Sequence, residues 1–454
     1  MRGRCGIVSA MSADFRQYFK GKKVTLMGLG LLGRGVGDAR FLAECGAELI
    51  VTDLKTEEQL AASVLQLRQF PNIIFRLGEH RLEDFQNRDV IVKAAGVPLD
   101  SIYIAEAKKN HIPVRMSADL FAELSGIPII GITGTRGKST VTECIAHILK
   151  TAGREVLLGG NVRGVSTLSL LSRVTGQSLA VLELDSWQLQ GFAEASMSPN
   201  IAVFTTFLPD HMNYYGGNMQ AYFADKAQIF LSQSESDTLV LGEQVAPFVK
   251  EYGYLKKIKS HAQVVGAKDL PKSITLQIPG EHNRYNAALA ASAARAFGVD
   301  EEVITEALRT FVGVPGRLQF LKEIHGVKIY NDNNSTVPDA TVAALKAVGD
   351  EKQKNVVLIM GGSEKNLDMS DLIVEVKKYC KKVVWLAGAG TDRIAPELPS
   401  TTIYRSIDEA TEAAFAAAES GDTLLFSPAF ASFGMFKNEY DRGDQFVAEI
   451  EKRS

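Results

Sequence analysis

The sequence has little that would tie it to a membrane, to nucleic acid or to disulfide bonds. Its four cysteines are scattered over 454 residues without metal-ligand or disulfide spacing, which is typical of reduced thiols in a cytosol. No apolar run approaches the roughly 20 residues of a membrane-spanning helix. The net charge is only −3, so we expect no nucleic-acid surface. Residues 1–23 lack the long apolar core of a signal peptide. We therefore expect a cytoplasmic protein without a membrane partner.

The length of 454 residues predicts about three domains. Short apolar runs, glycine-rich or polar turns and helix-like segments alternate along the chain, which predicts the α/β class. We place the domains at 1–116, with 1–21 as an extension, at 117–313 and at 314–454. The first and last are expected to be Rossmann-like. The central one is expected to hold a mostly parallel sheet of the P-loop ATPase type.

The glycine-rich stretch Gly131–Thr140 is the clearest functional motif. It follows an apolar run typical of a buried strand and precedes Val141–Lys150, whose apolar spacing predicts a helix. In this arrangement backbone N–H groups face an anion, Lys138 adds a positive charge, and Ser139 can ligate Mg²⁺. The strict motif has glycine where Ile132 stands, so a tight turn without a ligand is the alternative. The strand and helix on either side favour ATP phosphates.

The segment Lys22–Asp53 predicts a βαβ unit. The strand Val24–Met27 is followed by Gly28-x-Gly30-x-x-Gly33, a helix, and a second strand that ends at Asp53. This pattern lets the backbone approach a diphosphate and places an acidic group near a ribose or base. From these residues alone NAD binding is the simplest interpretation. A turn needed only for packing is the alternative.

Two strand ends of the central segment carry candidate metal ligands. The run Ser178–Glu183 predicts a buried strand that ends in a carboxylate, which suits Mg²⁺ beside a phosphate loop. The next predicted strand, Asn200–Thr206, leads to Asp210-His211, a candidate metal or phosphate contact. Taken alone, each of these is more often structural or solvated, and the same holds for Lys226 on the following helix.

From about residue 314 the chain alternates again between apolar runs and polar or glycine-rich loops. The runs predict parallel strands at Val327–Tyr330, Asn355–Met360, Val383–Leu386 and Thr423–Phe426. Ligands of such a doubly wound sheet lie at the carboxyl ends of its strands.

Taken in order, the motifs from about residue 22 to 447 resemble those of the Mur ligase family. The resemblance rests on Gly131–Thr140, Gly159-Gly-Asn161, Glu183-Leu-Asp-Ser-Trp-Gln-Leu189, Asp210-His211, Gly280-x-His282-Asn283-x-x-Asn286, Arg317, Asn331-Asp332, Gly361-Gly-x-x-Lys365-x-x-Asp368 and Ser427-Pro-Ala-x-Ala-Ser432-Phe-x-x-Phe436-Lys-x-x-x-x-Arg442-Gly443. The third and the last motif point to the members that add glutamate. A sibling that uses another amino acid, such as L-glutamate, is an alternative. An NAD-dependent oxidoreductase and a catalytically silent family member are two others.

The resemblance implies a ligase of peptidoglycan precursor synthesis. ATP would phosphorylate the carboxylate of UDP-N-acetylmuramoyl-L-alanine, and the amine of D-glutamate would attack the acyl phosphate. The implied cofactors are ATP and two Mg²⁺ ions, and the partners are small molecules only. A monomer is expected. The implied catalytic residues are Lys138, Glu183, His211 and Lys226, the last three of which, with Ser139, would ligate metal. Lys226 would be carbamylated, because an ammonium group would repel Mg²⁺.

The resemblance also implies binding residues in each domain. For ATP these are Gly134, Thr135, Arg136, Gly137, Lys138, Ser139, Thr140, Asn283, Asn286, Arg317 and Asp332. For the uridine diphosphate substrate, in place of NAD, they are Gly30, Leu31, Leu32, Asp53 and Asn161. For glutamate they are Thr336, Lys365 and Ser432, because a cation and two hydroxyls suit a dicarboxylic amino acid. Since the ATP ligands come from separate domains, domain closure is implied.

The sequence departs from the family pattern at a few places. Arg136 and Thr206 each replace an asparagine, Ala94-Ala95-Gly96 replaces Ser-Pro-Gly, Asn334 replaces a lysine and Gly316 a histidine. None of these changes removes an implied Mg²⁺ ligand. The changes at Ala94 and Asn334 affect expected substrate contacts.

Overall fold

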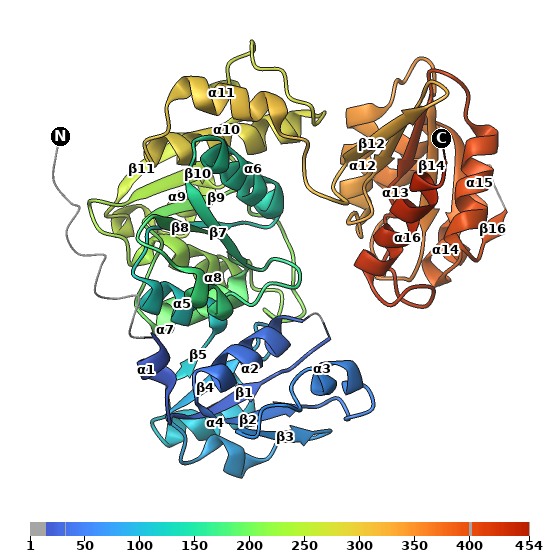
Figure 1. Cartoon of the computed structure of the whole chain (residues 1–454). Coiled ribbons are helices and arrows are strands. Elements are labelled where there is room, and N and C mark those ends of the chain that lie inside the picture. Colours follow the sequence, from blue (N-terminus) through green and yellow to red (C-terminus); the bar gives the residue numbers. More distant parts are fainter. Residues whose placement is uncertain (1–14, 32, 399–401, 454) are drawn as a thin grey trace. The chain divides into compact units, whose positions relative to one another are not determined.

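The computed structural model describes residues 15–31, 33–398 and 402–453, and it contains three β-sheets with helices packed on them (Figure 1). Leu32, one of the expected substrate contacts, lies outside the described residues. The described chain is α/β throughout, as the sequence predicts.

The first sheet has five strands in the order β3-β2-β1-β4-β5, and all of its pairs are parallel. The strands are β1 (Lys23–Met27), β2 (Glu48–Asp53), β3 (Ile73–Leu77), β4 (Val90–Lys93) and β5 (Val114–Arg115). The helices of this segment are α1 (Phe15–Phe19), α2 (Arg34–Glu44), α3 (Ala61–Leu65), η1 (Leu82–Phe85) and α4 (Ile102–Lys109). The chain runs from β1 to β2 on one side and later returns to β4 on the other. The glycine turn after β1 therefore lies at the switch point, where open α/β sheets bind ligands.

Part of the segment expected as an extension belongs to the core. Phe19 of α1 is fully buried, and its ring meets that of Phe41 edge-on at a centroid distance of 5.9 Å. Phe15 stacks on the same ring at 5.6 Å. The packed part of the chain therefore begins before residue 22.

The second sheet has six strands in the order β11-β10-β9-β6-β8-β7, again all parallel. The strands are β6 (Ile129–Thr133), β7 (Glu155–Gly160), β8 (Ser178–Glu183), β9 (Ile201–Phe204), β10 (Thr238–Gly242) and β11 (His261–Val265). The helices are α5 (Ser117–Ser125), α6 (Lys138–Thr151), η2 (Leu168–Arg173), α7 (Ser186–Glu194), α8 (Met219–Leu231), α9 (Ala246–Glu251), η3 (Leu255–Lys257), η4 (Ala267–Asp269), α10 (Glu281–Ala296) and α11 (Glu301–Thr310). Because β6 lies between β8 and β9, the loops after these three strands meet at one edge of the sheet.

The third sheet has six strands in the order β12-β13-β17-β14-β15-β16 and is mixed. The strands are β12 (Gln319–Ile324), β13 (Val327–Asn331), β14 (Val356–Gly361), β15 (Cys380–Leu386), β16 (Ile403–Tyr404) and β17 (Thr423–Phe426). The helices are α12 (Pro338–Val348), α13 (Ser370–Tyr379), α14 (Ala389–Ile394), η5 (Ala395–Glu397), α15 (Ile407–Ala417) and α16 (Glu439–Glu451). The four predicted strands are parallel, whereas β12, which the sequence analysis did not predict, pairs antiparallel with β13.

Strand β14 is covered on both faces, which explains why its sequence is a continuous apolar run. Leu358 joins a core with residues of α12 and α13, whereas its neighbour Ile359 joins a second core with residues of α15 and α16. Successive side chains of a strand point to opposite faces, so a strand covered on both faces must be apolar at every position.

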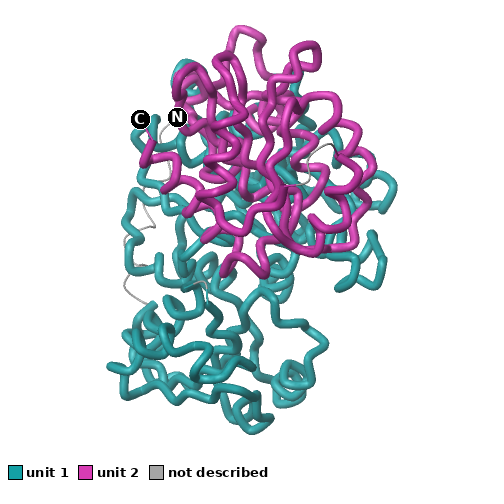
Figure 2. The backbone as a smooth tube through the Cα atoms, turned by 90° about the vertical axis from the view of Figure 1, so that its right-hand side faces the viewer, with its two compact units in different colours: residues 1–269, 288–304 teal, residues 270–287, 305–454 magenta. Residues whose placement is uncertain are grey.

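The described chain forms two compact units (Figure 2). The first unit comprises residues 1–269 and 288–304 and contains the first two sheets. The second comprises residues 270–287 and 305–454 and contains the third sheet. The proposed domain boundaries stay a prediction.

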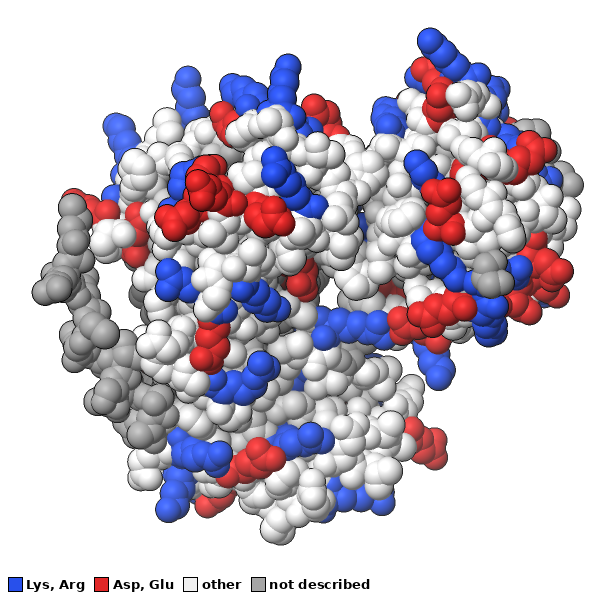
Figure 3. All heavy atoms as spheres, turned by 45° about the horizontal axis from the view of Figure 1, so that its top comes forward, with Lys and Arg blue, Asp and Glu red and all other residues white. Residues whose placement is uncertain are grey.

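The face drawn in Figure 3 carries lysine and arginine side chains interspersed with aspartate and glutamate. Its described residues form no broad region of a single charge on that face, in keeping with the small net charge. None of the described helices is both long and apolar enough to cross a membrane.

Candidate active site

The turn between β6 and α6 forms an anion cradle. Gly134 (φ 147°) and Gly137 (φ 84°) have backbone conformations that other residues rarely adopt. A Cβ atom on Gly134 would lie 2.0 Å from Oγ1 of Thr205, so only glycine fits there. Helix α6 begins at Lys138, and the N–H groups of a first helical turn have no partner within the helix. They are therefore available to a phosphate.

The loop after β9 holds this cradle in place. The N–H of Thr135 donates to the carbonyl of Thr206 at 2.7 Å, and the N–H of Arg136 donates to Oγ1 of Thr206 at 2.8 Å. The side chain of Arg136 extends toward Asp210, with Nη1 3.6 Å from Oδ2. Arg136 and Thr206, two of the residues that depart from the family pattern, are thus hydrogen-bonded to each other.

Two lysines converge on one carbonyl oxygen of the cradle. Nζ of Lys138 lies 3.0 Å and Nζ of Lys226 2.9 Å from the oxygen of Gly134. Lys226 is only 1% exposed, and burial, reinforced by the charge of Lys138, lowers its pKa well below the usual value. Its surroundings therefore disfavour the ammonium form of Lys226, and Nζ lies 4.8 Å from the centroid of the Tyr222 ring.

His211 lies in the same region in a left-handed backbone conformation, with φ 54°. Its ring packs on that of Trp187 with 4.7 Å between centroids. Burial lowers the pKa of His211, and the charge of Lys226 adds to the effect while that of Asp210 opposes it. The neutral imidazole favoured by this environment is the form that binds metal ions.

Glu183 is the last residue of β8 and is 4% exposed. Its Oε1 accepts a hydrogen bond of 3.1 Å from Nδ2 of Asn161. Glu143 of α6 was not singled out from the sequence. Burial raises its pKa, the charge of Lys150 opposes this shift, and the negative charge of Glu183 adds to it. Nothing in the local sequence around Glu143 indicates this proximity.

The residues of this edge fit a metal site only if Lys226 contributes a ligand. Among the described residues, no group of three or more His, Cys, Asp or Glu side chains is arranged to hold a metal ion. A buried lysine whose ammonium form is disfavoured is suited to carbamylation, which would supply an anionic ligand. The four expected ligands Ser139, Glu183, His211 and Lys226 all belong to the first unit.

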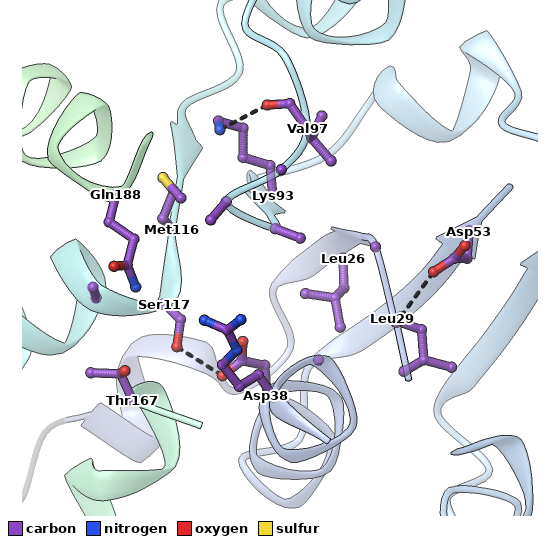
Figure 4. Close-up of a pocket in the computed structure, with 18 of the residues that line it drawn as sticks. Leu26, Leu29, Asp38, Asp53, Lys93, Val97, Met116, Ser117, Thr167 and Gln188 are labelled. Carbon is purple, nitrogen blue, oxygen red and sulfur yellow. Dashed lines mark hydrogen bonds between the residues drawn. The ribbon is translucent and has the colours of Figure 1, made fainter. Parts of the chain in front are cut away.

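A pocket of about 430 Å³ lies in the first unit, between the carboxyl ends of the first sheet and residues of the central segment (Figure 4). Gly30, Leu31 and Asp53 line it, as expected for substrate contacts. The carboxylate of Asp53 accepts the N–H groups of Gly30 and Lys55, both at 2.9 Å, and so closes the glycine turn. Its contact with uracil stays a prediction.

The wall of the pocket contains a buried acid that the sequence analysis missed. Asp38 of α2 accepts hydrogen bonds from Oγ of Ser117 at 2.8 Å and Oγ of Ser166 at 2.6 Å. Burial raises the pKa of Asp38 to about 6, although both hydroxyls oppose the shift. A Cβ on Gly37 would lie 2.6 Å from Cβ of Ser166. Helix α2 therefore packs closely on the central segment.

In the second unit, two of the three residues expected to bind glutamate are in contact. Nζ of Lys365 donates to Oγ1 of Thr336 at 3.2 Å. The third, Ser432, is 3% exposed and follows Ala431, which forms a β-bridge with Ser363. The loops that carry Lys365 and Ser432 are therefore neighbours.

Residues of the second unit expected to contact ATP differ in exposure. Asn283 and Asn286 are buried at the start of α10, while Arg317 is exposed. Asp332 is buried, which raises its pKa to about 6, and its carboxylate accepts hydrogen bonds from Leu318 N–H, Ser335 Oγ and Ser427 Oγ. This carboxylate holds three loop segments together, and its contact with ribose stays a prediction.

Comparison with known proteins identifies the family. Residues 132–294 match the Mur ligase middle domain, and residues 316–430 match the glutamate ligase domain of Mur ligases. The chain belongs to the Mur ligase family. The UDP-N-acetylmuramoylalanine–D-glutamate ligase of Roseiflexus sp. (strain RS-1) is 35% identical over 472 residues, covering 95% of this chain and 98% of that protein. The ligase of the same name from Borreliella burgdorferi (strain ZS7) is 35% identical over 447 residues, covering 93% and 96%.

Solved structures of Mur ligases share the fold. The UDP-N-acetylmuramate-alanine ligase of Thermotoga maritima superposes with a TM-score of 0.59 at 18% identity, covering 95% of this chain and 99% of that one. The MurF ligase of Thermotoga maritima in complex with ADP gives 0.55 at 17% identity, covering 89% and 95%. The predicted three-domain α/β fold is therefore confirmed. This Mur ligase is an ATP-dependent, amide-bond-forming enzyme of peptidoglycan synthesis, and the oxidoreductase alternative is set aside.

Proposed function

We propose that this Mur ligase adds D-glutamate to UDP-N-acetylmuramoyl-L-alanine through an acyl phosphate. The observation that carries the proposal is similarity over nearly the whole chain to relatives named for that reaction. The cation–hydroxyl pair of Lys365 and Thr336 supports a dicarboxylic amino acid as the incoming substrate. Both nucleotide substrates are cytoplasmic metabolites, so the reaction belongs in that compartment.

The cradle between β6 and α6 would bind the triphosphate. Backbone N–H groups of the first turn of α6 and the ammonium of Lys138 would face the β- and γ-phosphates. Two Mg²⁺ ions, when bound, would neutralise the phosphates and the substrate carboxylate that must meet them. Lys138 donates to the carbonyls of Gly134 and Thr135 at 3.0 and 3.3 Å, so its side chain already lies along the cradle.

Carbamylation of Lys226 is part of the proposal. The neutral amine would attack carbon dioxide, forming an N–C bond and releasing a proton, and the product is an anion. This step would place an anion beside the ammonium of Lys138, where a protonated Lys226 would be repelled. The full burial of Lys226 and its lowered pKa support the step, because only the unprotonated amine is nucleophilic. With Ser139, Glu183 and His211, the carbamate would supply the metal ligands.

Ligation by the purified chain tests the function. Phosphate release should require both UDP-N-acetylmuramoyl-L-alanine and an amino acid, and D-glutamate should be preferred over L-glutamate and over other amino acids. Release with L-glutamate alone would replace the proposal by that of a sibling ligase. If no pair of acceptor and amino acid gave release, the proposed reaction would be wrong.

A further inference from the structure

A hydrogen-bonded path leads from the substrate pocket to the expected metal ligand Glu183. It begins at Arg34, the first residue of α2, which lines the pocket. Nη1 of Arg34 donates to Oδ1 of Asn161 at 2.8 Å, and the two residues are 127 positions apart. Nδ2 of the same amide donates to Oε1 of Glu183 at 3.1 Å. One amide side chain thus joins a pocket cation to a buried carboxylate.

The chemistry of the three groups permits only one orientation of the amide. A guanidinium only donates hydrogen bonds, and a carboxylate only accepts them. The amide oxygen of Asn161 must therefore face Arg34, and its NH₂ group must face Glu183. Without Arg34, the carboxylate of Glu183 would still favour the NH₂ group, but the amide oxygen would lose the bond that fixes it, and the amide would be held from one side only.

The backbone around Asn161 cannot move away from Glu183. The N–H of Asn161 donates to the carbonyl of Glu183 at 2.7 Å. A Cβ on Gly160 would lie only 2.0 Å from that same carbonyl oxygen, so the chain passes as closely as glycine allows. Gly160 is held in turn by Oγ1 of Thr167 at 2.8 Å. With the backbone fixed, the amide rotamer determines how the Glu183 side chain is held.

We propose that Arg34 is a positioning residue for Glu183, which it orients through the amide of Asn161. The proposal rests on the proposed function, since that function identifies Glu183 as a metal ligand. Hydrogen-bonding partners that orient a ligand set its affinity for the metal, and their loss typically weakens binding about 10–100-fold. Arg34 therefore contributes to metal affinity although it does not itself contact the metal.

The test measures Mn²⁺ binding by electron paramagnetic resonance on the full chain with a non-hydrolysable ATP analogue. Arg34→Met should weaken Mn²⁺ binding about tenfold, and Arg34→Lys, which keeps a donor, should recover most of the loss. Arg34→Met should add nothing to Asn161→Ala, because both changes remove the same connection. Arg40→Met provides the matched control: Arg40 is on the same helix but bonds to Gln66 and does not line the pocket.

Three results would overturn the proposal. The first is an unchanged Mn²⁺ affinity in Arg34→Met, and the second is additive losses of Mn²⁺ affinity in the double variant. The third is an Arg34→Met variant that loses affinity for the UDP-linked substrate but not for Mn²⁺, which would make Arg34 only a substrate contact. The Arg34→Lys variant and thermal unfolding curves separate loss of positioning from misfolding. Ligation by the unaltered chain tests the proposed function separately, since Mn²⁺ binding needs no turnover.

Discussion

Replacing Lys226 by methionine separates the stability of the first unit from its activity. Methionine keeps most of the volume of the lysine side chain but has no amine to bury. The carbonyl of Gly134 keeps a donor, because Lys138 also bonds to it at 3.0 Å. Replacing a buried polar group by an apolar one of similar shape is nearly neutral or stabilising when no partner is left unpaired. Ligation, however, should be lost.

The pH dependence gives the size of the effect. Burial lowers the pKa of Lys226 below its ordinary value of 10.5, so between the folded-state pKa and 10.5 only the unfolded chain binds the proton. Stability of the wild type therefore rises with pH in this window, by about 1.4 kcal/mol per pH unit. The methionine variant lacks this contribution. Its advantage in unfolding free energy should therefore shrink by that amount for each pH unit within this window.

Urea unfolding in buffers free of carbon dioxide measures the effect, since carbamylation is then prevented. The chain has two tryptophans, of which Trp187 lies beside His211 and Trp385 is buried in the third sheet. In a Trp385→Phe background the fluorescence reports on the first unit. Lys150→Met, at an exposed lysine of α6, is the control and should show no such pH dependence. A difference between Lys226→Met and wild type that stays constant with pH would refute the reasoning.

Four further changes test other parts of the site. Lys226→Ala should lower ligation about a thousandfold, and formate should restore part of it; no rescue in kinetic assays would contradict the carbamate. Lys365→Ala should raise KM for glutamate about 10–100-fold with little change in kcat, and an unchanged KM would place Lys365 outside the pocket. Asp38 has a pKa raised to about 6 from 3.8, so its stabilisation is full below pH 3.8 and is lost as the pH rises through 6. Asp38→Asn should remove this loss of about 2–3 kcal/mol in unfolding free energy, as measured by urea unfolding at a series of pH values. The same pH profile in the variant and the wild type would contradict this assignment to Asp38. Arg442 is fully buried and donates hydrogen bonds to Asn333 and to the carbonyl of Phe430. Arg442→Met should therefore lower the unfolding free energy of the second unit by about 3 kcal/mol. A thermal midpoint, followed by Trp385 fluorescence, that does not change would contradict this.

Local sequence patterns were sufficient for the strands that end at the site. The prediction of Ser178–Glu183 matches β8 at both ends, because a buried parallel strand is apolar throughout and a polar residue marks its end. The phosphate loop was recognisable because its glycines, Gly134 and Gly137, are required by the backbone conformation itself. Such features depend on residues that are neighbours in sequence.

Features that depend on distant residues were not predictable. The bond from Arg34 to Asn161 joins positions 127 residues apart, and neither residue type signals the other. The hydrogen bonds that the Asp332 carboxylate accepts from Leu318 and two serines had no local signal, and its expected contact with ATP stays a prediction. Strand β12 is partly exposed and contains charged residues, so it lacks the apolar run that identified its neighbours. The residue pair His325-Gly326 was the local signal that could have revealed the hairpin, because both residues adopt positive φ in its turn.

The distribution of the expected ligands between the units has a consequence for the reaction. Glu183, His211 and Lys226 all lie in the first unit, where burial disfavours the charged forms of the lysine and the imidazole. Lys365 and Thr336, expected to hold glutamate, lie in the second unit. Assembly of the proposed metal site would therefore need no residue of the expected glutamate site, so carbamylation and metal binding should both be measurable without the amino acid. In the proposed acyl-phosphate mechanism the carboxylate is activated before the amine attacks, and this distribution of the expected ligands is compatible with that order.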